Sequence, residues 1–387
     1  LPEAFLKRSG MGLMRYLPAL AGVAVGGEET AAYVRRQVAQ TVRELWRERF
    51  GRIVDEGVHE AGLEAGIRID QVPVDPVEAG LYFSRPVLPS AQEAAGREAN
   101  VLAAGGARAL GRRHVMGSLP PFDPSPTPAA ALLPFPWKHD ADRLLADGAT
   151  RLLLEAGAGL PGEDAAFRQF RAGCAYVQRC QVLLQQGEPV ADVLVWAAAP
   201  PAALAAYSCD FVNGPVLATA AVRDGRIRFD SGRAYGVLAV TGEVLAEPDA
   251  ERRVAQLAGR GVEVWVVDGG EAAAARLREG GRKVSIGAEG VLPDFAWRSD
   301  GEGLNLRFLH RRVDGHEVYF VVNDGVEAGT AVCTFRDAGQ GAPARWEPLD
   351  GGIGVVERGL VRREGDGRVS VPLFLAPHDA CFVVFER

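Results

Sequence analysis

The sequence predicts a mixed α/β protein in which two regions of alternating strands and helices precede a region of short antiparallel strands. Three observations support this fold class. From residue 66 to residue 186, apolar runs of strand length alternate with stretches of helical periodicity, which is typical of parallel strands joined by crossover helices. An amphipathic helix ends at Gly187, and a new apolar run, Val190–Trp196, follows it. Beyond Leu304 the apolar residues recur at every second position, as in half-buried antiparallel strands.

The first region, residues 1–188, begins with a long helix and continues with three strand–helix units. The long helix is predicted over Glu28–Ala61, because its apolar side chains recur at helical spacing. Strands are predicted at Gly66–Val74, Arg113–Gly117 and Thr150–Glu155, and helices at Ala91–Ala104, Asp140–Ala146 and Asp164–Gln186. Residues 118–136 contain seven prolines and are predicted to form a loop. Three such units fit either half of a (β/α)8 barrel or a small open sheet.

The second region, residues 189–290, is predicted to be a flavodoxin-like α/β domain. Its strands are expected at Val190–Trp196, Arg226–Phe229, Tyr235–Val240 and Val262–Val267, and its helices at Asp210–Val222, Asp249–Gly259 and Glu271–Glu279. The third region, residues 300–387, is predicted to be an antiparallel β-sandwich, because several short strands are separated by turn residues. These strands are expected at Leu304–His310, Glu317–Val322, Thr330–Phe335, Val355–Val361, Arg368–Leu375 and Ala380–Phe385. Asp314-Gly315 is a strong hairpin signal between the first two of these strands.

Composition and charge exclude several classes of function. The chain has 387 residues, with 48% hydrophobic and 24% charged residues, which suits a globular protein of two to three domains. The net charge is -7, and no block of Lys or Arg stands out, so non-specific nucleic-acid binding is not expected. No apolar run reaches the length of a transmembrane helix. We therefore expect neither a nucleic-acid partner nor a membrane partner.

Cysteine and histidine usage points to no metal centre. The five cysteines are scattered without a CxxC pair, so we expect buried or free thiols, with zinc binding and a disulfide framework as alternatives. The six histidines are equally dispersed. The chain starts at Leu1 with no charged segment followed by an apolar one, so no signal peptide is visible. We expect a fragment or a processed chain, and its localisation and oligomeric state stay open.

Four places in the chain resemble a known family. They are Leu6–Gly22 (LKRSGMGLMRYLPALAG), Arg179–Val195 (RCQVLLQQGEPVADVLV), Tyr207–Asn213 (YSCDFVN), and the pair Val318–Asp324 (VYFVVND) and Val371–Phe385 (VPLFLAPHDACFVVF). In order and spacing they resemble the α-L-rhamnosidases of glycoside hydrolase family 106. The resemblance implies that residues 1–188 are the C-terminal part of a (β/α)8 TIM-type barrel. It also implies a calcium-assisted inverting hydrolase that removes terminal L-rhamnose.

Two carboxylates are the candidate catalytic residues. Inverting hydrolysis needs a general acid for the leaving oxygen and a general base for the attacking water, about 6.5–9.5 Å apart. In a parallel barrel such groups lie at the carboxyl ends of the strands. Asp70 ends or follows the first predicted strand and Glu155 ends the third, so these two are the candidate acid and base, in either order. The alternatives are a loop hydrogen bond or strand-end cap for Asp70 and a salt bridge at the barrel mouth for Glu155.

The second predicted strand departs from the family. Where the family carries a glutamate just past this strand, the sequence has Ser118, whose hydroxyl cannot serve as a general acid at neutral pH. His114 is a candidate contact for a sugar hydroxyl, and Trp137 could stack on a sugar face; a structural position for His114 and a core position for Trp137 are the alternatives. Two further segments are weaker signals. Tyr207, Asp210 and Asn213 suggest helix capping at the domain junction, and Asp268-Gly269-Gly270 weakly resembles a phosphate cradle.

The sequence supports three hypotheses about function. The first is a glycoside hydrolase of α-L-rhamnosidase type that uses Asp70 and Glu155. The second is a non-catalytic homologue that binds carbohydrate or has only a structural role, which Ser118 and the missing barrel units favour. The third is a nucleotide-binding enzyme, which rests on analogy with flavodoxin-like folds alone.

Overall fold

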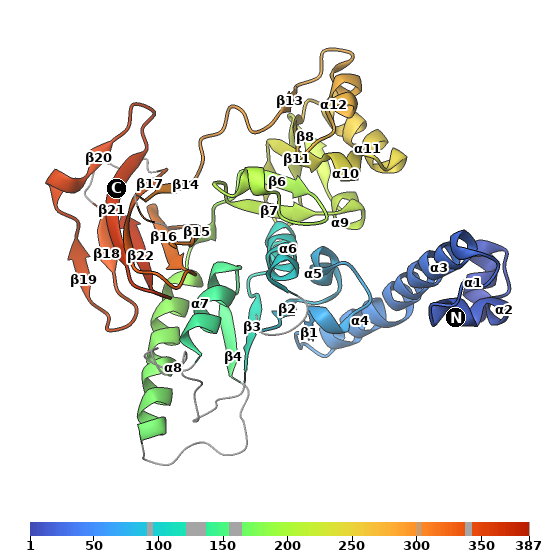
Figure 1. The fold of residues 1–387 in the computed structure, drawn as a ribbon, viewed down its shortest axis with the longest axis horizontal. Coiled ribbons are helices and arrows are strands. Elements are labelled where there is room, and N and C mark those ends of the chain that lie inside the picture. Colours follow the sequence, from blue (N-terminus) through green and yellow to red (C-terminus); the bar gives the residue numbers. More distant parts are fainter. Residues whose placement is uncertain are drawn as a thin grey trace.

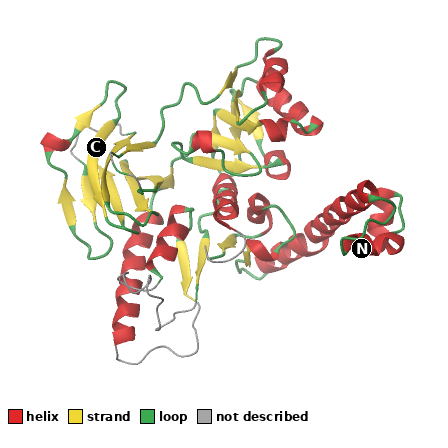
Figure 2. Cartoon of the chain, viewed as in Figure 1, coloured by secondary structure: helices red, strands yellow, loops and turns green. Residues whose placement is uncertain are grey.

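The structure is a computed structural model of the chain. It describes residues 1–90, 96–120, 137–154, 165–299, 301, 303–336 and 343–386. A helical arm at the N-terminus projects away from the rest of the molecule, in which a parallel sheet with helices, an α/β domain and a strand-rich C-terminal part lie against one another (Figure 1). Figure 2 shows that the C-terminal part is almost entirely strands and loops. A mixed α/β fold is therefore confirmed.

The arm is built from helices that share a small apolar core. They are α1 (Pro2–Ser9), α2 (Leu13–Leu20), α3 (Glu28–Trp46), a π-helical turn (Arg47–Gly51) and α4 (Arg52–Glu60). Helix α3, the π-helical turn and α4 run on without a break, as the predicted helix over residues 28–61 requires. The buried side chains of the arm are Phe5, Leu13, Ala19, Ala31, Val34 and Val38. None of the helices in the described residues is long and apolar enough to cross a membrane.

The arm leads into a four-stranded parallel sheet with crossover helices, which is called the barrel half below because half a (β/α)8 barrel is predicted for residues 1–188. Its strands are β1 (Gly66–Arg68), β2 (Arg85–Leu88), β3 (Met116–Leu119) and β4 (Arg151–Leu154), paired in that order. The helices are α5 (Ala79–Tyr82), α6 (Gly96–Ala109), α7 (Lys138–Ala146) and α8 (Ala165–Leu184). The sequence analysis missed β2, because a run of four residues that starts Arg-Pro carries too little period-two signal. It also placed β3 too early, so Ser118 lies inside that strand rather than just past it.

The α/β domain contains a five-stranded parallel sheet. Its strands are β6 (Val193–Trp196), β7 (Cys209–Val212), β11 (Val237–Thr241), β12 (Glu263–Val267) and β13 (Val284–Ile286). Their spatial order is β13-β12-β11-β6-β7, which in chain order is the 2-1-3-4-5 arrangement of flavodoxin-type sheets. The helices are α9 (Gly214–Ala218), α10 (Gly242–Leu245), α11 (Pro248–Gly259) and α12 (Glu271–Arg278), and β8 (Ala221–Arg223), β9 (Arg226–Arg228) and β10 (Ala234–Tyr235) form a small antiparallel sheet.

One predicted helix in this domain is wrong. Residues 210–222 were expected to be helical, but they contain β7, the short helix α9 and the start of β8. The polar Asp210 interrupts the apolar run of β7 and hides its strand character, although its side chain is fully buried. Asn213 caps α9 by accepting a hydrogen bond from the Val216 backbone N–H at 3.1 Å, as expected.

The C-terminal part consists of two antiparallel sheets. One contains β14 (Phe295–Arg298), β17 (Gly329–Phe335), β21 (Val369–Leu375) and β20 (Arg362–Arg363). The other contains β19 (Ile353–Val355), β18 (Ala344–Trp346), β22 (Ala380–Phe385), β16 (His316–Asn323), β15 (Leu306–Val313) and β5 (Glu188–Pro189). Asp314 and Gly315 turn the β15–β16 hairpin with φ values of 49° and 86°, which confirms the predicted hairpin; such a turn needs positive φ at both positions.

The six-stranded sheet is buried on both faces. On one face, Tyr319 and Val321 of β16 pack with Val383 and Phe385 of β22 against the four-stranded sheet. On the other face lie apolar residues of the same strands and of helices α7 and α8, namely Val318, Phe320, Val322, Phe382, Ala141, Leu144, Tyr176, Val177 and Leu184. This second contact joins the C-terminal part to the barrel half, and two-sided burial accounts for the nearly continuous apolar runs of β16 and β22.

Gly187 connects the barrel half to the C-terminal sheet. It ends the turn after α8 with φ 57°, and the next two residues form β5, which pairs with Arg311 and Arg312 of β15. A Cβ atom on Gly187 would lie 1.9 Å from the Arg312 carbonyl oxygen. Only glycine meets both requirements, a left-handed backbone and a backbone contact that leaves no room for a side chain.

We therefore predict that Gly187→Ala destabilises the protein more than Gly62→Ala does. Both glycines have a left-handed φ, 57° and 67°, so both variants carry the penalty of about 1–2 kcal/mol for an L-residue there. Nothing lies within 4 Å of a Cβ on Gly62, so only Gly187→Ala adds a clash. Chemical denaturation gives the two free energies of unfolding, and equal losses in the two variants would contradict the clash.

Candidate functional site

The carboxyl ends of the four barrel strands are the first candidate site, because catalytic groups of parallel barrels gather there. Asp70 lies two residues beyond the end of β1, in a short 3-10 turn (Ile69–Gln71). Its carboxylate accepts hydrogen bonds from Arg68 at 2.9 and 3.2 Å. These bonds are the main reason that the pKa of Asp70 is lowered. An aspartate in this state is ionised at neutral pH, so it suits a base better than an acid.

Glu155 and Ser118 are the other residues of interest at this end of the sheet, and neither is a described titratable group. Glu155 directly follows β4 in the sequence but lies outside the described residues, so its catalytic role stays a prediction. Ser118 lies within β3 and is 4% exposed. Leu119 and Pro120, which follow it, carry no titratable group. The described end of β3 therefore offers no replacement for the glutamate that the resemblance leads us to expect.

His114 does not lie at this end, and Trp137 is buried in the core. His114 precedes β3 and so stands at the amino end of the sheet, where burial and the charges of Arg151, Arg113 and Arg85 lower its pKa. Trp137 precedes α7 and is 2% exposed within the core between the barrel helices and the C-terminal sheet. Neither placement favours contact with a sugar at the barrel mouth, and both roles stay predictions.

The described residues do not supply a calcium cage. Calcium takes six to eight oxygen ligands, several of them carboxylates. Among the described residues no three Asp, Glu, His or Cys side chains come together in a way that could hold a metal ion. Calcium binding therefore stays a prediction of the resemblance.

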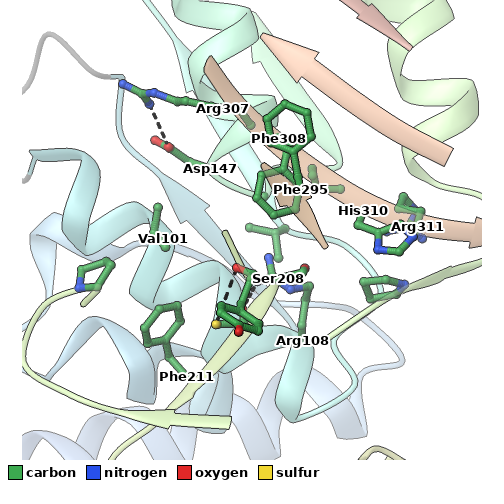
Figure 3. Close-up of a pocket in the computed structure, with 18 of the residues that line it drawn as sticks. Val101, Arg108, Asp147, Ser208, Phe211, Phe295, Arg307, Phe308, His310 and Arg311 are labelled. Carbon is green, nitrogen blue, oxygen red and sulfur yellow. Dashed lines mark hydrogen bonds and ion pairs between the residues drawn. The ribbon is translucent and has the colours of Figure 1, made fainter. Parts of the chain in front are cut away.

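The second candidate site is a cavity at the opposite, amino ends of the strands. It measures about 1080 Å³ and lies where the barrel half, the α/β domain and the C-terminal part meet (Figure 3). The barrel half contributes residues of α6, the turns before β3 and β4, and the end of α8. The α/β domain contributes residues 200–202, 204–209, 211 and 231–233, and the C-terminal part contributes residues 295–297 and 305–311.

A buried carboxylate behind this cavity joins two of the three parts. Asp210 of β7 accepts hydrogen bonds from Arg108 of α6 at 2.7 Å, from Arg233 at 2.9 Å and from the Tyr235 hydroxyl at 2.6 Å. Burial alone would raise the pKa of Asp210, but the two arginines and the hydroxyl outweigh it, so the pKa is lowered. We call these four residues the Asp210 cluster.

Two further polar networks involve cavity-lining residues of the C-terminal part, Arg307 and His310. Arg307 of β15 pairs with Asp147, which follows α7, at 3.3 Å, and also with Asp324. Burial raises the pKa of Asp147 to about 6 in spite of the nearby Arg307 and Arg97. His310 lies between two carboxylates, Asp294 at 2.8 Å and Glu317 at 2.9 Å.

No local pattern in the sequence reveals this cavity. Its arginines are spread from residue 97 to residue 311 and belong to three parts of the chain. Asp210 was expected to help cap a helix, and the only local signal of its real position is a polar residue in the apolar run CDFV. Tyr207, which was grouped with it, donates a hydrogen bond to the Val291 carbonyl at 3.2 Å.

Comparison with known proteins identifies the fold. The chain matches no protein-family model. It is 23% identical to a putative beta-glucuronidase of Formosa agariphila, over 98% of this chain and 36% of that protein. A rhamnosidase from Novosphingobium sp. PP1Y superposes with a TM-score of 0.74 and 22% identity, over all of this chain and 43% of the other. An alpha-L-fucosidase isoenzyme 2 from Paenibacillus thiaminolyticus has a TM-score of 0.51 at 11% identity, over 93% and 73% of the two chains.

The resemblance predicted from the sequence is therefore confirmed: the chain has a rhamnosidase-like glycoside hydrolase fold. The chain spans about two fifths of the length of the putative beta-glucuronidase and of the rhamnosidase, 36% and 43%. At these identities the likeness shows the fold, and the activity is a separate question.

We predict that Asp210→Asn destabilises the protein by roughly 3–5 kcal/mol at neutral pH, because Arg108 and Arg233 lose their shared negative partner while their side chains stay only 16% and 18% exposed. The folded-state pKa of Asp210 lies below the unfolded value of about 3.9. Its stabilising contribution is therefore complete above the unfolded value and is lost as the pH falls through the folded one.

Urea denaturation at pH 7 and at pH 3 tests this prediction, because the difference between the native chain and Asp210→Asn should be full at pH 7 and smaller at pH 3. Asp249→Asn is the matched control, because Asp249 pairs with Arg252 on the surface and its side chain is 90% exposed. The control should change stability by less than about 1 kcal/mol. Similar losses in the two variants at pH 7 would show that the Asp210 cluster contributes no more than a surface ion pair.

Proposed function

We propose that this chain supplies the C-terminal half of the catalytic barrel of a glycoside hydrolase that removes terminal α-L-rhamnose from oligosaccharides or glycosides. The observation that carries the proposal is the match of its whole length to part of a rhamnosidase, with a TM-score of 0.74. The position of Asp70 just beyond the carboxyl end of β1 supports it, because glycosidase carboxylates lie at this end of a barrel.

The state of Asp70 suggests which carboxylate has which role. The hydrogen bonds from Arg68 favour the ionised form, so Asp70 is the proposed base that takes a proton from the attacking water. Glu155 is then the proposed acid that protonates the leaving oxygen. In an inverting enzyme the two carboxyl groups stand about 6.5–9.5 Å apart, and the water attacks from the face opposite the leaving group.

The four-stranded sheet needs further strand–helix units to form a closed catalytic barrel. A closed (β/α)8 barrel needs four more strand–helix units, and among the described residues the outer edges of β1 and β4 pair with no further strand. We propose that these units come from another polypeptide segment that docks on the two edges. The full length of the two relatives, of which this chain covers 36% and 43%, agrees with such a segment.

We predict that Glu155→Gln and Asp70→Asn each lower the release of rhamnose from an aryl α-L-rhamnoside by about 10²–10⁴-fold, the usual contribution of a general acid or base. Proton NMR of the released sugar would identify β-L-rhamnose as the first product if the configuration inverts. Asp249→Asn, an exposed carboxylate of the α/β domain, serves as the control. Unchanged turnover in Glu155→Gln would remove Glu155 from the site.

A second candidate is a non-catalytic homologue that binds carbohydrate or has a structural role. The observation that favours it is Ser118, which is buried within β3 where the resemblance leads us to expect a catalytic glutamate beyond the strand. Calorimetry with rhamnose-containing oligosaccharides, run beside the activity assay, separates the two candidates. Binding without turnover supports the second, and turnover that depends on Asp70 and Glu155 supports the first.

A further inference from the structure

The cavity between the three parts is distinct from the proposed catalytic site. It lies at the amino ends of β3 and β4, whereas Asp70 lies at the carboxyl end of β1. Its volume of about 1080 Å³ slightly exceeds that of most small-molecule sites, which measure about 300–1,000 Å³. The cavity is therefore large enough for an organic ligand.

The charge around the cavity is positive, although the chain as a whole carries -7. Three carboxylates line it, Glu98, Asp147 and Glu188, and so do seven arginines, namely Arg97, Arg108, Arg112, Arg113, Arg233, Arg307 and Arg311. Asp147 is already paired with Arg97 and Arg307, each at 3.3 Å. The excess of guanidinium groups favours an anion.

Arg311 is the buried cation that lacks a carboxylate partner. It is 6% exposed, and it donates from Nε and Nη2 to the Gln186 and Gly187 carbonyls, each at 2.9 Å. Among the described residues, its Nη1 has no hydrogen-bond partner and no acidic side chain forms an ion pair with Arg311. A buried charge without a partner is unfavourable.

The neighbours of Arg311 add positive charge around its guanidinium group, which favours a bound anion. Burial, followed by the charges of Arg108 and Arg233, lowers the pKa of Arg311 to about 10. Those two arginines share the single carboxylate of Asp210, so three guanidinium groups lie near one buried carboxylate. Glu188 offsets this only in part, and it is exposed.

Aromatic side chains form the apolar part of the wall. Phe295 and Phe308 lie side by side with ring centroids 5.1 Å apart, and Figure 3 shows them across the cavity from Phe211. Tyr207 and Trp297 also line the cavity, and Trp297 is 37% exposed. Flat apolar faces beside guanidinium groups suit a ring that carries both C–H surfaces and a negative charge.

We propose that this cavity binds a carboxylate-bearing sugar, with Arg311 Nη1 donating to the carboxylate and the aromatic wall packing on the pyranose ring. A simple inorganic anion would leave the apolar wall and most of the volume unfilled. A neutral sugar would leave Arg311 without a counter-charge. The site takes no part in hydrolysis, so it goes beyond the proposed function and does not depend on it.

Isothermal titration calorimetry with D-galacturonate, D-galactose and acetate at equal ionic strength tests the proposal. D-galacturonate should bind at least tenfold more tightly than either of the others, because it alone offers both a carboxylate and a ring. Equal affinity for acetate would show that the site binds any small anion and would contradict a sugar site. Equal affinity for D-galactose would show that the carboxylate does not contribute to binding. Absence of D-galacturonate binding would overturn the proposal.

Three variants locate the site. Arg311→Gln should weaken D-galacturonate binding at least tenfold, and Trp297→Ala, which changes an exposed side chain without changing charge, should weaken it several-fold. Arg276→Gln is the control, because Arg276 lies on α12 with a side chain that is 56% exposed and does not line the cavity.

Thermal melting shows whether each variant folds. If Arg311→Gln does not fold, the proposed site is tested by Trp297→Ala and by the comparison of the three ligands on the native chain. Unchanged affinity in a folded Arg311→Gln or in Trp297→Ala would overturn the proposed location. Asp70→Asn should bind D-galacturonate as the native chain does, which separates this site from the proposed catalytic one. Loss of binding in Asp70→Asn would contradict that separation.

Discussion

The contact between the barrel half and the α/β domain depends on a buried carboxylate, Asp210. Its fully buried side chain accepts hydrogen bonds from Arg108 of the barrel half and from Arg233 and Tyr235 of the α/β domain. Because a carboxylate without these donors would be strongly unfavourable in the interior, the Asp210 cluster holds α6 against the edge strand β7. It also positions the two arginines that stand behind the cavity, so the same interaction that joins two domains creates the positive environment of Arg311.

The C-terminal part is held mainly by apolar contact and is fixed in orientation by polar contact. One face of β16 and β22 packs on α7 and α8, while Arg307 reaches from β15 to Asp147 beside α7. Apolar burial is strong but not directional, whereas ion pairs and hydrogen bonds fix the register of the parts. Gly187 makes the connection possible, since any side chain there would meet the backbone of β15.

The two ends of the barrel strands therefore offer different chemistry. The carboxyl end carries Asp70, held ionised by Arg68, and is the proposed place of hydrolysis. The amino end opens into a cavity whose charge is provided by arginines from three parts of the chain. His114 was a candidate for the first end but stands at the second, because β3 begins at Met116 and His114 precedes it.

The sequence by itself determined the mixed α/β class, the β15–β16 hairpin, the long helix of the arm, the helix cap at Asn213 and the likeness to rhamnosidases, because each is encoded by residues that are close together in the chain. It also directed attention to Asp70, since a carboxylate just after a strand has a known place in a parallel barrel. It could not reveal β2 or β7, whose short runs contain Pro86 or the polar Asp210. Only the tertiary structure decided that Asp210 is buried, that Arg108, Arg233 and Arg311 meet, and that a cavity lies beside them. These properties depend on contacts between residues about 100 or more positions apart, and no local pattern of sequence records which distant charges will share one buried partner.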